Sequence, residues 1–215
     1  SGSSLPVDAR QARDRAAILD AAELLSTENG LRGVRLEDVA RRARVAPRSL
    51  YNVFGSRDGL MLALTERALD SCEARIAGAL AGAGDPFERA AAAVDAYGRF
   101  FLEEPVRFTL LRQTLAHADE PQLELAARAV AERYDRQRRG LAAALAEADG
   151  IDEERADELS YLLLGISTGV LALASVGDPL ARTREELRAM LNRGVSDLLR
   201  GAAGSPRRSD RKLLD

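Results

Sequence analysis

The chain has 215 residues, of which 46% are hydrophobic and 30% are charged, and its net charge is −3. With one His, one Cys and a single Lys (Lys212), the composition excludes a Cys/His zinc site, a disulfide framework within the chain and catalysis by an interior lysine. Gly82–Phe87 is a poor match to a dinucleotide-binding loop. We therefore expect no enzyme activity, no cofactor and no metal.

Ala and Leu dominate, whereas residue types that favour strands are sparse, so the chain is predicted to be all-α. The boundaries follow from Gly30, which stops a helix, from the capping box at Asp85–Glu88 and from a second capping box at Thr183–Glu186. About nine helices are expected, over residues 9–29, 36–43, 47–54, 57–80, 86–104, 105–116, 121–149, 152–176 and 183–200.

We expect three regions: a helix-turn-helix domain at 9–56, a larger helical domain at 57–201 and a disordered basic tail at 202–215. Charge is uneven among them. Residues 32–57 hold seven Arg and only two acidic residues, although the whole chain is slightly acidic. This concentration fits either a solvated charged face or a surface that binds a polyanion.

The two short helices at 36–43 and 47–54 are joined by a three-residue turn, as in a helix-turn-helix. Ala40 and Ala43 supply the small residues that the helix crossing requires, and Pro47 suits a first helical position. Arg and Asn side chains can read guanine and adenine edges, while Ser and Tyr hydroxyls can donate to phosphate oxygens. The side chains predicted to face outward are Arg48, Ser49, Tyr51 and Asn52.

Between Arg15 and Leu64 the sequence resembles the TetR family of transcriptional regulators. The resemblance rests on ILDAA at 18–22, LEDVA at 36–40 and, above all, VAPRSLYNVFGSRDGL at 45–60. It implies a homodimer on a pseudo-palindromic operator in double-stranded DNA, released or retuned by a small-molecule effector. Downstream of this segment, only the number of helices and the pattern of a ligand-binding, dimerising domain are similar.

By position, Tyr51 is similar to the family's phosphate-contacting tyrosine, and Arg57 stands where a phosphate-binding lysine is usual. Arg35 replaces a Thr or Ser cap and offers a longer arm toward phosphate. Arg44 replaces the usual turn glycine, which would cost roughly 1 kcal/mol if that residue is left-handed. Val53 replaces a frequent histidine. These departures affect the expected operator sequence more than the expected function.

Most of the aromatic residues fall between Phe87 and Tyr134, and an effector pocket is usually apolar and aromatic with a few polar groups. The residues expected to line such a pocket are Tyr97, Phe101, Phe108, Arg112, His117, Tyr134 and Tyr161. The alternative is that the aromatics are core residues and that His117 lies in an exposed loop. Cys72 is expected to pack as a small apolar group.

The helices at 152–176 and 183–200 are the expected dimer interface, because small residues four apart allow close helix approach. The interface residues expected are Leu162, Gly165, Ile166, Gly169, Val170, Leu173, Leu187, Leu191, Val195 and Leu198. Two alternatives remain: the first of these helices could be a core helix of a single chain, or its uncharged run from Leu159 to Val176 could span a membrane.

Together these features predict a dimeric, ligand-responsive DNA-binding regulator, most simply a repressor. The alternative is a helical small-molecule-binding or enzymatic protein whose N-terminal helices are only scaffold. A single thiol and the lack of a secretory signal favour the cytoplasm, with no membrane partner.

Overall fold

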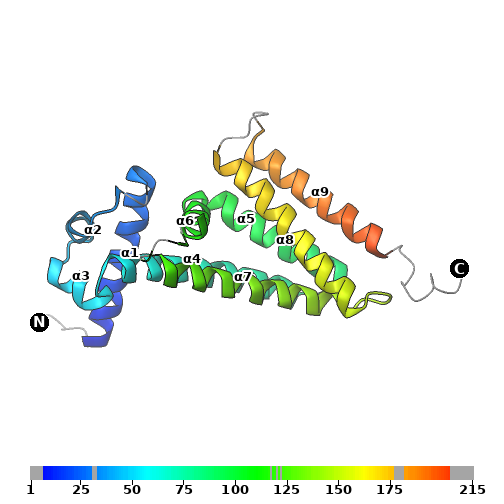
Figure 1. Ribbon diagram of the computed structural model, residues 1–215, viewed down its shortest axis with the longest axis horizontal. Coiled ribbons are helices and arrows are strands. Elements are labelled where there is room, and N and C mark those ends of the chain that lie inside the picture. Colours follow the sequence, from blue (N-terminus) through cyan, green and yellow to red (C-terminus); the bar gives the residue numbers. More distant parts are fainter. Residues whose placement is uncertain are drawn as a thin grey trace, which may run out of the picture. The chain divides into compact units, whose positions relative to one another are not determined.

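The computed structural model describes residues 7–30, 33–116, 118–119, 121, 123–176 and 182–203. These residues form nine α-helices and no strand, which confirms the all-α prediction (Figure 1). The helices are α1 (Val7–Asn29), α2 (Leu36–Ala43), α3 (Pro47–Phe54), α4 (Arg57–Leu80), α5 (Pro86–Glu103), α6 (Pro105–Ala116), α7 (Glu124–Leu145), α8 (Glu153–Val176) and α9 (Arg184–Ala203).

The described residues divide into two compact units. The first unit holds those up to Ala68 together with Thr109–Ala131, and the second holds Leu69–Phe108 together with those from Glu132 onward. The first unit therefore contains α1, α2 and α3 and also parts of α4, α6 and α7. The domain boundary at residue 56 stays a prediction from the sequence.

The core of the first unit forms where α1, α2 and α3 meet. Helix α1 contributes an apolar stripe in which Ile18 and Ala22 are fully inaccessible, and α2 adds Val39. Leu50 of α3 and Leu60 of α4 are also fully buried in this cluster. Burial of large aliphatic side chains is the main stabilising contribution here, at roughly 1.5–3 kcal/mol for each.

Local capping signals set several helix ends where the sequence predicts them. Asp85 accepts a hydrogen bond from the Glu88 backbone N–H at 2.9 Å, and the Glu88 carboxylate accepts from the Asp85 N–H at 3.1 Å. Ser56 Oγ accepts from the Gly59 N–H at 3.1 Å at the start of α4. Each cap satisfies donors that the first helical turn would otherwise leave unpaired.

Two helices differ from their predicted extents. Helix α7 begins at Glu124 and ends at Leu145, and the segment that follows it forms turns, in which the Ala148 N–H donates to the Leu145 carbonyl at 3.0 Å. Helix α9 continues to Ala203, three residues beyond the prediction, because Ala202 remains buried at 3% exposure. Residues 202 and 203 are therefore helical, and the rest of the predicted tail lies outside the described residues.

In the second unit, α5 packs against both α8 and α9, and α8 also packs against α9. Gly98 permits close approach, since a Cβ there would lie 3.1 Å from Leu191 Cδ2. Polar contacts fix the same pair of helices. Arg188 Nε donates to Asp95 Oδ1 at 2.9 Å and Asn192 Nδ2 donates to the same oxygen at 2.7 Å.

Candidate nucleic-acid interface and effector cavity

The turn between α2 and α3 has the tight geometry of a helix-turn-helix. Arg44 has φ 56° and ψ 39°, so it is left-handed, as the usual glycine would be. The Val45 N–H donates to the Ala40 carbonyl at 3.0 Å and closes the end of α2. The left-handed conformation at a residue with a side chain costs about 1 kcal/mol.

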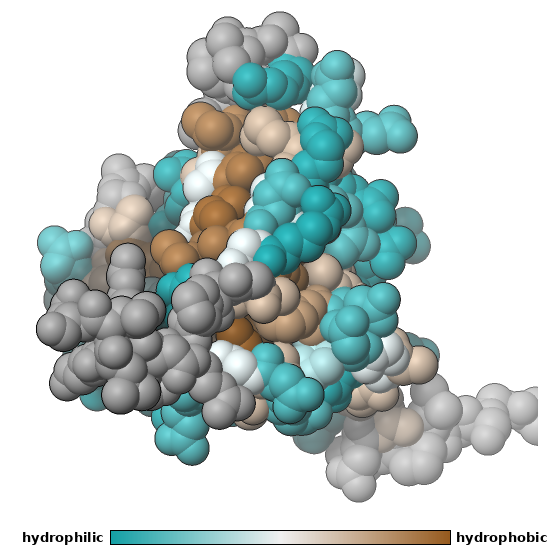
Figure 2. Space-filling view, turned by 90° about the vertical axis from the view of Figure 1, so that its right-hand side faces the viewer, coloured by the Kyte–Doolittle hydropathy of each residue, from teal (hydrophilic) through white to brown (hydrophobic). Residues whose placement is uncertain are grey.

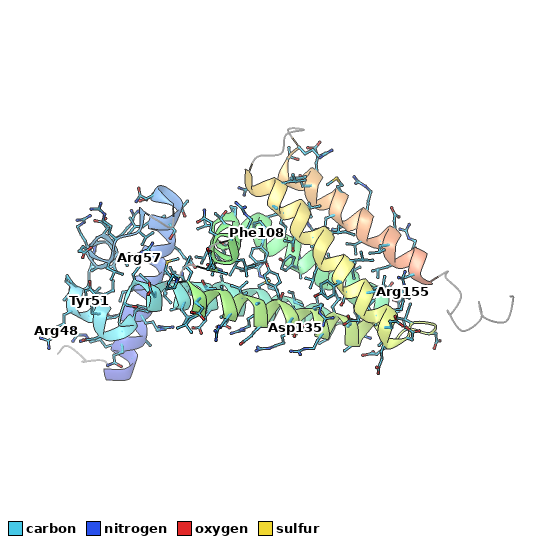
Figure 3. All side chains as sticks on the ribbon, in the orientation of Figure 1. Arg48, Tyr51, Arg57, Phe108, Asp135 and Arg155 are labelled. Atoms are coloured by element: carbon cyan, nitrogen blue, oxygen red, sulfur yellow. The ribbon has the colours of Figure 1, made fainter. Side chains whose placement is uncertain are left out.

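Helix α3 has an inner and an outer face. Leu50 and Phe54 point into the core of the first unit, and the Arg15 guanidinium lies 5.0 Å from the centre of the Phe54 ring. Tyr51 is 47% exposed, and Arg48 and Asn52 are also exposed. Figure 3 shows Arg48 extending outward from α3. The outward position expected for Tyr51 agrees with this arrangement.

Cations at the surface of α2 and α3 fall into two groups. Arg41 pairs with Asp38, and Arg42 pairs with Glu28 at 2.8 Å. Within the described part of the chain, exposed Arg48 has no carboxylate within ion-pair distance, and the same holds for exposed Arg35 and Arg44. The charge of this second group is thus available to an anion that approaches from solvent.

Two residues predicted to contact DNA are less exposed to solvent than the sequence indicates. Ser49 is half-buried rather than fully outward. Arg57 is also half-buried, and its Nε donates to the Val34 carbonyl at 3.5 Å. The Arg57 side chain therefore braces the segment that leads into α2.

Four of the predicted pocket residues come together in the second unit. The Tyr97 and Phe101 ring centres are 4.9 Å apart, and those of Phe101 and Phe108 are 5.2 Å apart, all in edge-to-face contact. The Tyr97 and Tyr134 hydroxyls share a hydrogen bond at 3.0 Å. Tyr97, Phe101 and Phe108 are buried, so the cluster also serves as core, as the alternative expected.

The other predicted pocket residues do not join this cluster. Arg112 is exposed and belongs to the first unit. Tyr161 is 66% exposed on α8, with the Arg138 guanidinium 5.1 Å from its ring centre. His117 lies outside the described residues.

A small apolar cavity that opens to solvent lies among α4, α5, α7 and α8 of the second unit. Tyr97 is the one sequence-predicted residue in its lining. The residues that line it are Ile76, Ala93, Val94, Tyr97, Gln137, Leu141, Leu164 and Ser167. The sequence could not single out most of these residues, because aliphatic side chains at helical spacing are indistinguishable from ordinary core.

Three buried ionisable groups at or near this cavity, Tyr97, Tyr134 and Cys72, stay neutral at physiological pH. Burial raises the pKa of Tyr97 well above its ordinary value, and burial also raises that of Tyr134. Burial raises the pKa of the Cys72 thiol to about 12, which agrees with the expected packing role of this residue. Both phenols are thus hydrogen-bonding groups rather than charges.

Of the predicted dimer residues, those on α8 are accessible. Leu162 is 47% exposed, Ile166 37% and Leu173 41%, and Gly165 and Gly169 are exposed on the same helix. Val170 of α8 is half-buried. Figure 2 shows an apolar strip bordered by hydrophilic side chains on the face that it presents.

The residues predicted on α9 are placed differently. Leu187, Leu191 and Val195 are each only 1% exposed, within the subunit's own core, and Leu198 is half-buried. The first three residues are therefore corrected to intrachain packing, because α9 turns its most apolar face toward α5 and α8. Periodicity alone shows that a face is apolar, not what covers it.

Helix α8 is also the one described helix whose length and hydropathy would suffice to cross a membrane, over Glu153–Leu173. About a third of that window is buried inside the protein. Two of its residues, Leu164 and Ser167, line the cavity. Because α8 is partly buried and lines the cavity, these observations favour a packed helix over a membrane span.

Residues 18–64 match the family model described as "Bacterial regulatory proteins, tetR family". A curated relative, the HTH-type transcriptional repressor KstR of Mycolicibacterium smegmatis (strain ATCC 700084 / mc(2)155), is 29% identical over 119 residues. That alignment covers 55% of this chain and 58% of the relative, so the chain matches little more than half of the repressor's length.

Solved structures match over nearly the whole chain. A transcriptional regulator from Rhodococcus sp. Rha1 is 26% identical, with a TM-score of 0.69, over 91% of this chain and 99% of that one. A TetR-family regulator from Streptomyces coelicolor is 20% identical, with a TM-score of 0.75, over 94% and 98% of the two chains, which shows a shared fold. These relatives are regulators rather than enzymes, as expected from the sequence. The helix-turn-helix of the chain is thus similar to that of the TetR family of transcriptional regulators, and the whole chain shares the fold of solved TetR-family regulators.

Proposed function

We propose that the protein is a cytoplasmic, dimeric repressor that binds a pseudo-palindromic operator and leaves it when a small-molecule effector binds. The observation that carries this proposal is the outer face of α3, where Arg48, Tyr51 and Asn52 are exposed above a well-packed core. These side chains combine a guanidinium and an amide that read base edges with a phenol that donates to phosphate.

Two further observations support the dimer and the effector. The exposed apolar residues of α8 leave a face that a second copy can bury, and a two-fold pair presents two recognition helices to successive turns of DNA. The cavity in the second unit gives an effector a place to bind. An effector that binds a dimer conformation with one spacing of the recognition helices more tightly than a conformation with another spacing changes the fraction of dimers that can bind DNA.

The proposal is tested by selecting binding sites for the purified protein from a randomised duplex library. We expect enrichment of two inverted half-sites whose centres are about one helical turn of DNA apart, or a multiple of that distance. Failure to enrich any sequence, or enrichment of a single unrepeated site, would contradict the proposal.

The selection is repeated with a variant that carries Arg48→Ala, Tyr51→Phe and Asn52→Ala together. All three changes lie on the outer face of α3, so the fold should persist, and circular dichroism checks that it does. We expect this variant to enrich nothing above the input library.

A further inference from the structure

We infer that the cavity of the second unit takes an uncharged, mainly apolar small molecule bearing one hydroxyl group, which donates a hydrogen bond to the side-chain carbonyl of Gln137. This inference rests on the proposed function in one respect, namely that the cavity is the effector site. It adds the chemical class of the effector and the residue that distinguishes it.

The lining of the cavity excludes charged ligands. None of its eight residues is acidic or basic, and most are aliphatic, including Ile76, Leu141 and Leu164. An ionised group placed there would lose its hydration without gaining a counterion. The ligand must therefore be neutral and bury mostly carbon.

Gln137 has a buried side-chain oxygen that lacks a hydrogen bond to the described residues. Its side chain lines the cavity, the residue is 8% exposed, and its Oε1 is buried with no hydrogen-bond partner in the described part of the chain. Buried polar atoms are rarely left unsatisfied, and such exceptions often mark a place where a ligand or water completes the bonding. A ligand hydroxyl is the smallest neutral group that donates to an amide oxygen.

The other polar groups of the cavity are already engaged. Ser167 Oγ donates to the Leu163 carbonyl at 2.6 Å, within its own helix. The Tyr97 hydroxyl is paired with that of Tyr134 at 3.0 Å. Both hydroxyls therefore already make a hydrogen bond, whereas Gln137 Oε1 makes none to the described residues, so a single ligand hydroxyl is the expected recognition element.

Cations on the neighbouring turns of α7 are also occupied. Arg133 forms ion pairs with Asp70 at 2.6 Å and with Glu73, and Arg138 pairs with Asp157 and, at 3.2 Å, with Asp135. Neither arginine lines the cavity. A carboxylate ligand would therefore find no free guanidinium there.

The test uses three probes of matched shape: 4-ethylphenol, ethylbenzene and 4-ethylbenzoate. Each is titrated to about 1 mM into the full chain without DNA, and binding is followed by protein NMR shifts of the cavity residues. We expect 4-ethylphenol to bind roughly 3- to 10-fold more tightly than ethylbenzene, as one neutral hydrogen bond provides, and 4-ethylbenzoate to bind least. Binding of none of the three, or tightest binding of the benzoate, would overturn the inference.

The contribution of Gln137 is isolated with Gln137→Met, which keeps the length of the side chain and removes the acceptor. In this variant the preference for the phenol over ethylbenzene should vanish, while ethylbenzene binds as well as before or better. The matched control is Gln113→Met on α6, in the first unit, which should keep the wild-type preference. If Gln137→Met retains the preference, Gln137 is not the partner.

Failure of this inference is separable from failure of the proposed function, because the probe titrations involve no DNA. If the wild-type protein selects an operator but binds none of the probes, only the proposed ligand class is overturned. If the protein selects no operator but prefers the phenol in a way that depends on Gln137, the ligand class is upheld and the proposed regulatory function is overturned.

Discussion

Arginines are used in two opposite ways in this protein. In the second unit, Arg133, Arg138 and Arg188 each bind carboxylates on a neighbouring helix, and the hydrogen bonds that Arg188 donates to Asp95 raise the pKa of Arg188. On the outer face of α2 and α3, Arg48 and Arg44 are exposed and have no carboxylate partner among the described residues. Paired arginines hold helices together, whereas unpaired ones keep their charge for an incoming anion.

This difference explains how a chain with net charge −3 can bind a polyanion. Unpaired cations gain most from phosphates, because each contact releases a condensed counterion from the DNA. The comparison therefore predicts that changes at the two kinds of arginine affect different measurements.

The largest effect should follow from placing charges on the exposed apolar face of α8. Leu162→Asp combined with Ile166→Asp would bury unpaired carboxylates in the proposed dimer, at a cost of about 3–5 kcal/mol. We expect a monomer by sedimentation velocity and loss of operator binding. Leu125→Asp is the control, since Leu125 is 66% exposed on α7, and it should remain dimeric. A dimeric double variant would show that α8 is not the interface.

Loss of an unpaired arginine should change DNA recognition and leave stability alone. Arg48→Ala should weaken operator binding by roughly 1–3 kcal/mol and relax the preference at one base position in each half-site. The control is Arg128→Ala, which removes the same charge from an exposed pair with Glu124 on α7. An Arg48→Ala protein that keeps the full sequence preference would remove Arg48 from base recognition.

Loss of a paired arginine should lower stability and leave DNA recognition unchanged. Arg133→Met removes the closer of the two ion pairs of half-buried Glu73 and leaves it only Arg136, at 3.7 Å, so we expect a loss of about 1–2 kcal/mol in the free energy of unfolding. The melting temperature should fall by roughly 3–6 °C. Arg128→Met, in an exposed pair, should change it by less than about 1 °C, and equal losses in the two variants would contradict the comparison.

The smallest effect concerns the turn of the helix-turn-helix. Arg44→Gly should stabilise the protein by about 0.5–1 kcal/mol in urea denaturation, because glycine adopts the left-handed conformation without strain. Lower stability of the glycine variant would mean that the Arg44 side chain stabilises the turn by contacts that outweigh the strain.

Much of the fold follows from local sequence signals. Asp85 with Glu88, Ser56 before α4 and the short spacing around Arg44 each fix a boundary through neighbours only a few residues away, and the structure matches them. The resemblance to the TetR family from Arg15 to Leu64 is likewise readable from the sequence, because the residues that define a helix-turn-helix lie close together in the chain.

The candidate sites were harder to predict, because they depend on which helices pack together. The sequence shows that Leu187 and Leu191 form an apolar stripe but not that α5, about ninety residues earlier, covers them. It likewise marks Tyr97 as a pocket residue, yet gives no signal for Gln137, whose importance comes from burial without a partner. Arg112 is predicted as a polar pocket residue because it lies near aromatic residues in the sequence, although it is exposed and belongs to the other unit.

The most direct test of the account is a fluorescence anisotropy titration of the selected operator duplex at one fixed salt concentration. It compares the wild-type protein with a variant carrying Arg48→Ala, Tyr51→Phe and Arg57→Ala, and with Arg128→Ala. The account predicts that the triple variant binds at least about 100-fold more weakly, whereas Arg128→Ala binds like wild type. Equal affinities for the triple variant and the wild type would show that the outer face of α3 does not contact DNA.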